Sequence, residues 1–92
     1  VGLFGLSFKP NIDDLRESPA KYITQKLLQE TNNQEYLVIE PNIENHPIYK
    51  LSNFKDAARL ADILVFLVAH DEFKQIKIER SKHVLDFCGI FN

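Results

Sequence analysis

Four short apolar runs divide this chain, and the segments between them carry apolar residues at helical spacing. The runs cover residues 1–6, 36–39, 63–68 and 84–87. Apolar runs of this length, bounded by turn residues, are typical of buried strands. The segments 19–30 and 53–60 instead repeat apolar residues every three or four positions, as one face of a helix requires. The pattern predicts the order strand, helix, strand, helix, strand, short helical turn, strand.

Capping residues mark where the helices begin. Ser18 followed by Pro19 is a strong start, because serine caps a helix and proline suits its first position. We expect Ser52 to cap the second helix and Asp71 to cap a short turn through Gln75. The expected buried stripes are Tyr22, Ile23, Leu27 and Leu28 in the first helix, and Phe54, Ala57, Ala58 and Ala61 in the second.

The alternation of buried strands with helices defines the fold class. Such strands form a parallel sheet covered on both faces, and its crossovers are right-handed. We therefore expect an α/β fold, a Rossmann-like three-layer sandwich with a small parallel sheet. With 92 residues, the chain is one domain, spanning residues 1–92.

Amino-acid composition limits the classes of binding partner and the cellular compartment that we expect for this chain. The formal net charge of −2, from 13 acidic and 11 basic residues, argues against nucleic acid or an anionic membrane as the main partner. The single cysteine, Cys88, fits a reducing cytoplasm. No apolar run reaches the roughly 18 residues of a membrane span. Because the chain starts at Val1 within an apolar run, we expect it to be a piece of a longer protein.

The loop between the first strand and the first helix holds the main candidate chemistry. Such loops are where α/β folds bind ligands. Lys9 and Arg16 would place two cations beside a helix N-terminus, which itself attracts anions. The alternative is that Asp13, Asp14 and Glu17 neutralise both cations in a surface ion network. Spacing alone leaves these two interpretations open.

Other candidates favour structural roles. Gly2 and Gly5 lack the G-x-G-x-x-G spacing of a dinucleotide site, and the pair Asp13-Asp14 suits loop ordering better than phosphorylation or metal binding. The three histidines, His46, His70 and His83, lack metal-ligand spacing. His70 is the most interesting, since it follows the third strand at the ligand edge. Cys88 has no C-x-x-C partner, so we interpret it as a partly buried thiol rather than a nucleophile.

The run from Gly5 to Ala20 resembles a family motif, G-L-x-F-K-x-x-x-D-D-x-R-E-S-P-A. This motif opens the C-terminal domain of the UDP-glucose/GDP-mannose dehydrogenase family. Later segments resemble the same domain in the same order: residues 38–42 (V-I-E-P-N), 61–65 (A-D-I-L-V), 70–73 (H-D-E-F) and 85–86 (L-D). The resemblance thus covers essentially the whole chain. Within the family it looks most like the branch that oxidises UDP-N-acetyl-D-mannosamine.

The resemblance implies a division of labour between domains. An N-terminal domain would bind NAD, a central region would carry the catalytic cysteine that forms a thiohemiacetal and thioester, and this domain would close over the UDP-sugar. The C6 alcohol would be oxidised to a carboxylate with two NAD. Phe8 and Lys9 would contact the UDP-sugar, and Arg16 would reach toward NAD. The implied parent is cytoplasmic and a homo-oligomer, and this chain alone holds no catalytic residue and no metal site.

One position departs from the family pattern. Many members have a cation in a D-x-R-G or D-x-K-G string, where this chain has Asp86-Phe87-Cys88-Gly89. The substrate contacts therefore differ, or the parent protein is altered in specificity or activity. Two other classes stay open: a non-catalytic nucleotide- or phosphate-binding module, and an inactive relative of the enzyme.

Overall fold

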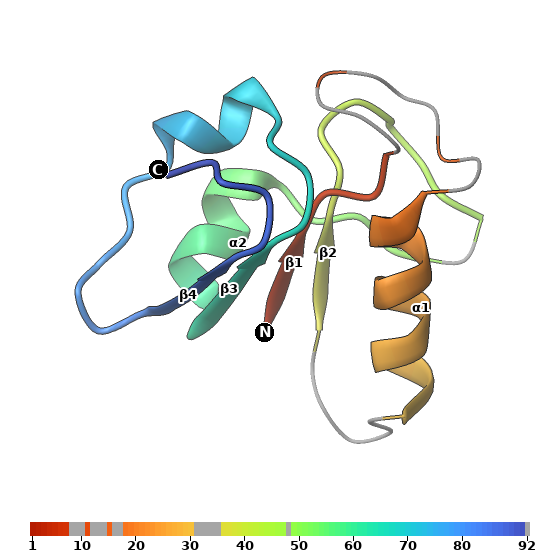
Figure 1. The fold of residues 1–92 in the computed structure, drawn as a ribbon, viewed down its shortest axis with the longest axis horizontal. Coiled ribbons are helices and arrows are strands. Elements are labelled where there is room, and N and C mark those ends of the chain that lie inside the picture. Colours follow the sequence, from red (N-terminus) through yellow and green to blue (C-terminus); the bar gives the residue numbers. More distant parts are fainter. Residues whose placement is uncertain (8–10, 12–14, 16–17, 31–35, 48, 92) are drawn as a thin grey trace.

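The computed structural model of this chain describes residues 1–7, 11, 15, 18–30, 36–47 and 49–91. Its elements follow the predicted order (Figure 1). They are β1 (Gly2–Phe4), α1 (Pro19–Glu30), β2 (Leu37–Ile39), α2 (Phe54–Leu60), β3 (Ile63–Phe66), the 3-10 helix η1 (Asp71–Gln75) and β4 (His83–Asp86). The helices match the predicted spans closely. β1 and β3 are shorter than their apolar runs, because the last two residues of each run leave the sheet and enter the next loop. β2 begins one residue after the start of its run, and β4 begins and ends one residue before its run.

The strands form one parallel four-stranded sheet in the order β2-β1-β3-β4. Leu3 lies between Val38 on β2 and Val65 on β3, and Val65 also pairs with Leu85 on β4. The chain moves from β1 outward to β2 and then returns past β1 to β3. The direction of winding therefore reverses beside β1. In open α/β sheets, ligands bind outside the carboxyl ends of the strands at such a reversal.

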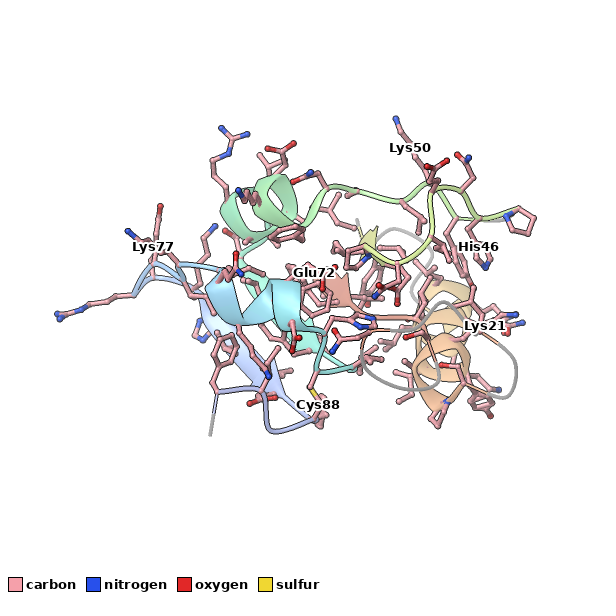
Figure 2. All side chains as sticks on the ribbon, turned by 90° about the horizontal axis from the view of Figure 1, so that it is seen from above. Lys21, His46, Lys50, Glu72, Lys77 and Cys88 are labelled. Atoms are coloured by element: carbon pink, nitrogen blue, oxygen red, sulfur yellow. The ribbon has the colours of Figure 1, made fainter. Side chains whose placement is uncertain are left out.

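Helices cover both faces of the sheet, as the sequence predicts (Figures 1 and 2). The α2 face holds the main core, whose fully buried aromatic rings Phe4, Phe66 and Phe73 contact one another. The alternate residues Leu3, Val38 and Val65 are buried toward the α1 side, since successive side chains of a strand point to opposite faces. The Rossmann-like three-layer arrangement is confirmed.

The stripe predicted for α1 is only partly buried: Leu27 and Leu28 are half-buried, but Tyr22 and Ile23 are exposed. Tyr22 is 57% exposed and Ile23 42% exposed, whereas Ala20 and Thr24 are buried. Ala20 and Thr24 lie four positions apart and therefore share one face of the helix, and this small-residue face is the buried one. On α2 the expected stripe is confirmed, with Ala57, Ala58 and Ala61 buried and Phe54 packed against the same core.

Two predicted helix caps were also wrong. Asn53, rather than Ser52, caps α2, because its side-chain oxygen accepts the backbone N–H of Lys55 at 2.9 Å. At η1 the cap position belongs to His70, and the Asp71 carboxylate instead contacts Lys74.

The last strand differs from the buried strand that its apolar run suggests. β4 lies at the edge of the sheet, and Val84 and Leu85 are 38% and 48% exposed. No helix follows β4 in the described chain. Because successive side chains point to opposite faces, both faces of this edge strand are partly exposed in the described chain.

Candidate ligand site at the carboxyl edge of the sheet

The residues predicted to bind ligand fall outside the described part of the chain. Phe8, Lys9 and Arg16 belong to this group, as do Asp13, Asp14 and Glu17. Their predicted roles stay predictions. The structure does describe how the loop that contains them starts and ends, and which residues hold it against the sheet.

A glycine turn starts the loop. Gly5 has φ of +110°, and a Cβ at this position would lie 2.7 Å from the Cβ of Val68. Only glycine meets both conditions, because other residues avoid this backbone region and the space is already filled. Gly5 therefore lets the exit of β1 pack directly against the exit of β3.

Ser18 joins the end of the loop to its start. Its hydroxyl reaches the carbonyl oxygens of Leu6 at 2.5 Å and Ser7 at 3.1 Å, and its oxygen accepts the N–H of Lys21 at 3.2 Å. The last contact is the predicted N-cap of α1. The same side chain thus fixes the start of α1 against the exit of β1.

Glu40, the first residue after β2, organises the centre of the edge. Its side chain is buried, and Oε1 accepts the N–H groups of Leu6 at 2.9 Å and Ser7 at 3.0 Å. Oε2 accepts the backbone N–H of Asn42 at 3.0 Å. Burial raises the pKa of Glu40, but hydrogen bonds from His70, Leu6 and Asn42 outweigh it and lower the pKa to about 2. Glu40 is therefore a buried carboxylate that ties β2 to the exit of β1.

His70, which follows β3, is fully buried beside this carboxylate. Its Nε2 lies 2.8 Å from Glu40 Oε1 and 3.2 Å from Ser7 Oγ. Its Nδ1 lies 2.7 Å from the backbone N of Asn11 and 3.1 Å from Nδ2 of Asn42. Amide N–H groups only donate, so we assign Nδ1 as an acceptor and place the proton on Nε2. The structural role favoured from the sequence is thereby confirmed.

The remaining histidine on this edge belongs to a separate contact. His46 stacks on Tyr49 with ring centres 4.7 Å apart, and its Nδ1 accepts the Tyr49 N–H. Burial lowers the pKa of His46, and the nearby Lys21 ammonium lowers it further. Figure 2 shows Lys21 and His46 together, one from the start of α1 and one from the segment after β2. Lys21 thus adds a cation to this edge of the sheet. This residue lies outside the motif that runs from Gly5 to Ala20.

Cys88 lies at the exit of β4 and is unsuited to nucleophilic chemistry. Its thiol contacts Asp86 Oδ1 at 3.5 Å, and Asp86 also accepts the N–H groups of Ile90 and Phe91 at 3.0 Å each. Burial raises the pKa of the Cys88 thiol, and the neighbouring Asp86 carboxylate raises it further. The thiolate is therefore disfavoured. The predicted partly buried free thiol is confirmed.

A hollow of about 410 Å³ lies beside the network, between the exit of β2 and the start of α2. Its lining includes Glu40, Glu44 and Glu72 along with apolar and small polar side chains. This acidic lining disfavours a phosphate there. Within the described segments, no group of three histidine, cysteine or acidic residues is placed to hold a metal ion.

The sequence missed the contact between Glu40 and His70. In the sequence these two residues belong to separate segments, residues 38–42 and 70–73. Glu40 directly follows β2 and His70 lies four residues after the end of β3, and these two strands flank β1. Carboxyl ends of neighbouring parallel strands meet at one edge, so the sheet order is the signal that brings these two side chains together.

These features define a doubly wound α/β domain with a loop anchored at the ligand edge of its sheet. The chain belongs to the UDP-glucose/GDP-mannose dehydrogenase family, whose UDP binding domain matches residues 2–92. The resemblance noted in the sequence is confirmed. None of the helices in the described segments is long and apolar enough to cross a membrane.

Curated relatives give the same picture. The chain is 44% identical over 98 residues to the UDP-N-acetyl-D-mannosamine dehydrogenase of Salmonella typhi, which covers 99% of this chain and 23% of that protein. It is 42% identical over 98 residues to the NDP-N-acetyl-D-galactosaminuronic acid dehydrogenase of Ralstonia nicotianae, covering 100% of this chain and 23% of that protein. The chain therefore spans about a quarter of the length of these relatives.

Solved structures agree on the fold. A ternary complex of GDP-mannose dehydrogenase from Pseudomonas aeruginosa matches with a TM-score of 0.80 at 25% identity, covering 97% of this chain and 24% of that one. The UDP-N-acetyl-mannosamine dehydrogenase from S. aureus matches with a TM-score of 0.66 at 24% identity, covering 99% of this chain and 26% of that one.

Proposed function

We propose that this chain is the UDP-sugar-binding C-terminal domain of a larger NAD-dependent nucleotide-sugar 6-dehydrogenase. The reaction proposed for the whole protein is the two-step oxidation of UDP-N-acetyl-D-mannosamine to the uronate. The family match, the dehydrogenase relatives and the quarter-length coverage support this assignment. We further propose that the parent is a cytoplasmic homo-oligomer, and that neither nucleic acid nor a membrane is a partner.

The observation that carries the proposal is the anchoring of the motif loop. The hydroxyl of Ser18 binds the carbonyl of Leu6, while the Leu6 N–H binds the buried Glu40. Ser7 and Ser18, which flank the motif loop, are therefore held together at the carboxyl end of β1. This strand lies beside the reversal of the winding direction. In a doubly wound sheet this is the ligand position.

The side chains of this loop suit a nucleotide sugar. Lys9 supplies a mobile positive charge for the diphosphate, and Phe8 supplies an apolar surface for the substrate. Arg16, just before α1, is proposed to reach the cofactor held by another domain. Asp13 and Glu17 are proposed to orient the two cations. The start of α1 adds backbone donors and a positive dipole end.

The described residues do not themselves form an NAD site. A dinucleotide fingerprint uses glycines so that a pyrophosphate can approach the backbone. Here the space beside Gly5 is filled by Val68, so this glycine serves internal packing. NAD, which would accept the hydride in each oxidation, is therefore proposed to bind mainly to a domain outside this chain. The catalytic cysteine is proposed to lie in the central region of the parent protein, outside this chain, since Cys88 is a poor nucleophile.

Steady-state kinetics on a full-length protein containing this chain test the assignment. Replacing Lys9 with alanine should lower kcat/KM for the UDP-sugar by at least tenfold, because a charge-assisted phosphate contact is lost. The KM for NAD should change less than twofold. Lys26→Ala, on the exposed surface of α1, serves as the matched control. Equal kinetics for both variants would overturn the role of Lys9.

A dehydrogenase assay with several UDP-hexoses separates the competing classes. Activity with at least one of them supports the enzyme. UDP binding without any oxidation would favour the non-catalytic module or an inactive relative.

A further inference from the structure

Asn11 is held in the loop by two reciprocal hydrogen bonds to the segment after β3. Its backbone N–H donates to His70 Nδ1 at 2.7 Å, and its side-chain Oδ1 accepts the N–H of Asp71 at 2.9 Å. Its φ is +63°, a left-handed conformation that asparagine adopts more readily than most residues. Asn11 is thus pinned in an uncommon conformation two positions after Lys9.

The opposite side of the same imidazole is bound to the sheet. His70 Nε2 lies 2.8 Å from Glu40 Oε1, and that oxygen also accepts the N–H groups of Leu6 and Ser7. The ring therefore bridges a carboxylate fixed to the exit of β1 and the backbone of the loop. Phe73 packs edge-on against the ring, with centroids 5.4 Å apart, and limits its rotation.

We propose that His70 is a positioning residue for nucleotide binding. As the neutral Nε2–H tautomer, it accepts the Asn11 N–H and so holds this residue of the motif loop against the segment that follows β3. The inference rests on the proposed function, because the loop it positions is the proposed UDP-sugar loop. His70 itself needs no contact with the nucleotide.

Two substitutions separate the two halves of this bridge. In His70→Asn, the amide oxygen can take the place of Nδ1 and accept the Asn11 N–H, whereas the donor to Glu40 is lost. In His70→Gln, the amide NH₂ can take the place of Nε2 and donate to Glu40, whereas the acceptor for Asn11 is lost. His70→Gln loses the Nδ1 contacts with Asn11 and Asn42, and His70→Asn loses the Nε2 contacts with Glu40 and Ser7, so both should lose thermal stability.

Their effects on UDP binding should diverge. Titrated with UDP, the His70→Gln chain should bind about tenfold more weakly than the unsubstituted chain, and His70→Asn within about threefold of it. A merely structural role would weaken binding equally in both variants. Equal affinities, or weaker binding by His70→Asn, would overturn the proposal.

NMR without nucleotide provides an independent measurement. The ¹⁵N shifts of His70 should show an unprotonated Nδ1 and a protonated Nε2 in the unsubstituted chain. The Asn11 amide should keep its protection from hydrogen exchange in His70→Asn and lose at least tenfold of it in His70→Gln. A protonated Nδ1 contradicts the proposal even where a variant fails to fold. If the unsubstituted chain fails to bind UDP, the proposed function is contradicted, while the tautomer and the Asn11 amide still decide the role of His70.

Discussion

Glu40 and His70 lie thirty residues apart in the chain and meet at 2.8 Å in the buried edge of the sheet. Both residues are buried, with an exposed fraction of 2% for Glu40 and 0% for His70. The Glu40 carboxylate accepts the backbone N–H groups of Leu6 and Ser7, after β1, and of Asn42, after β2. It also contacts the His70 imidazole. A buried charge is tolerated only with such a complete set of partners. The contact therefore fixes three segments of the chain relative to one another, and the motif loop is attached to it.

The first prediction concerns acid stability. The pKa of Glu40 is about 2 in the folded chain, against its ordinary value of 4.5. A lowered folded pKa contributes stability that is present above pH 4.5 and is lost as the pH falls through the folded value. The free energy of unfolding should therefore decrease between about pH 5 and pH 2 by roughly 2–3 kcal/mol from this group.

Urea unfolding across this pH range measures the effect. Glu40→Gln should be less stable at pH 7 and should lack this part of the pH dependence. Glu44→Gln, at an exposed position of the same segment, is the control and should retain it. A Glu40→Gln chain with the full slope would show that another carboxyl is responsible.

The second prediction concerns Thr24, whose buried hydroxyl has no hydrogen-bond partner in the described part of the chain. Replacing it with valine keeps the shape and removes the cost of an unsatisfied polar group. Thr24→Val should raise the free energy of unfolding by about 1 kcal/mol. Thr24→Ser keeps the hydroxyl, removes a buried methyl and should be destabilising by about 1 kcal/mol. Thermal unfolding of both variants tests this, and a less stable Thr24→Val would mean that the hydroxyl has a partner.

The third prediction uses two glycines with positive φ but different surroundings. At Gly5 a Cβ meets Val68 at 2.7 Å, whereas at Gly89 it meets nothing within 4 Å. Gly89→Ala should therefore cost about 1 kcal/mol for the backbone conformation alone. Gly5→Ala adds overpacking at the exits of β1 and β3 and should cost at least about 2 kcal/mol more than Gly89→Ala. Equal denaturation midpoints for the two variants would contradict the close packing at Gly5.

Much of the fold follows from local sequence. The apolar runs predict the strands, and Ser18-Pro19 predicts the start of α1, because both signals act within a few residues. The buried face of α1 could not be predicted from hydrophobicity, since the small residues Ala20 and Thr24 are buried while Tyr22 and Ile23 are exposed.

The site was less accessible from sequence. The sequence places the motif loop at the carboxyl edge of the sheet, because its position after β1 is local information. The network behind it depends on which strands flank β1, and that order is set by the packing of the whole chain. The contact between Glu40 and His70 therefore could not be predicted from the sequence.

The most direct test of the central claim is a UDP titration of the 92-residue chain, followed through backbone amide shifts. Saturable shifts should concentrate in residues 5–20, and Lys9→Ala should weaken binding at least tenfold while Lys26→Ala leaves it unchanged. Absence of saturable shifts in this loop, or equal binding by the two lysine variants, would contradict the assignment of the loop as the UDP-binding element.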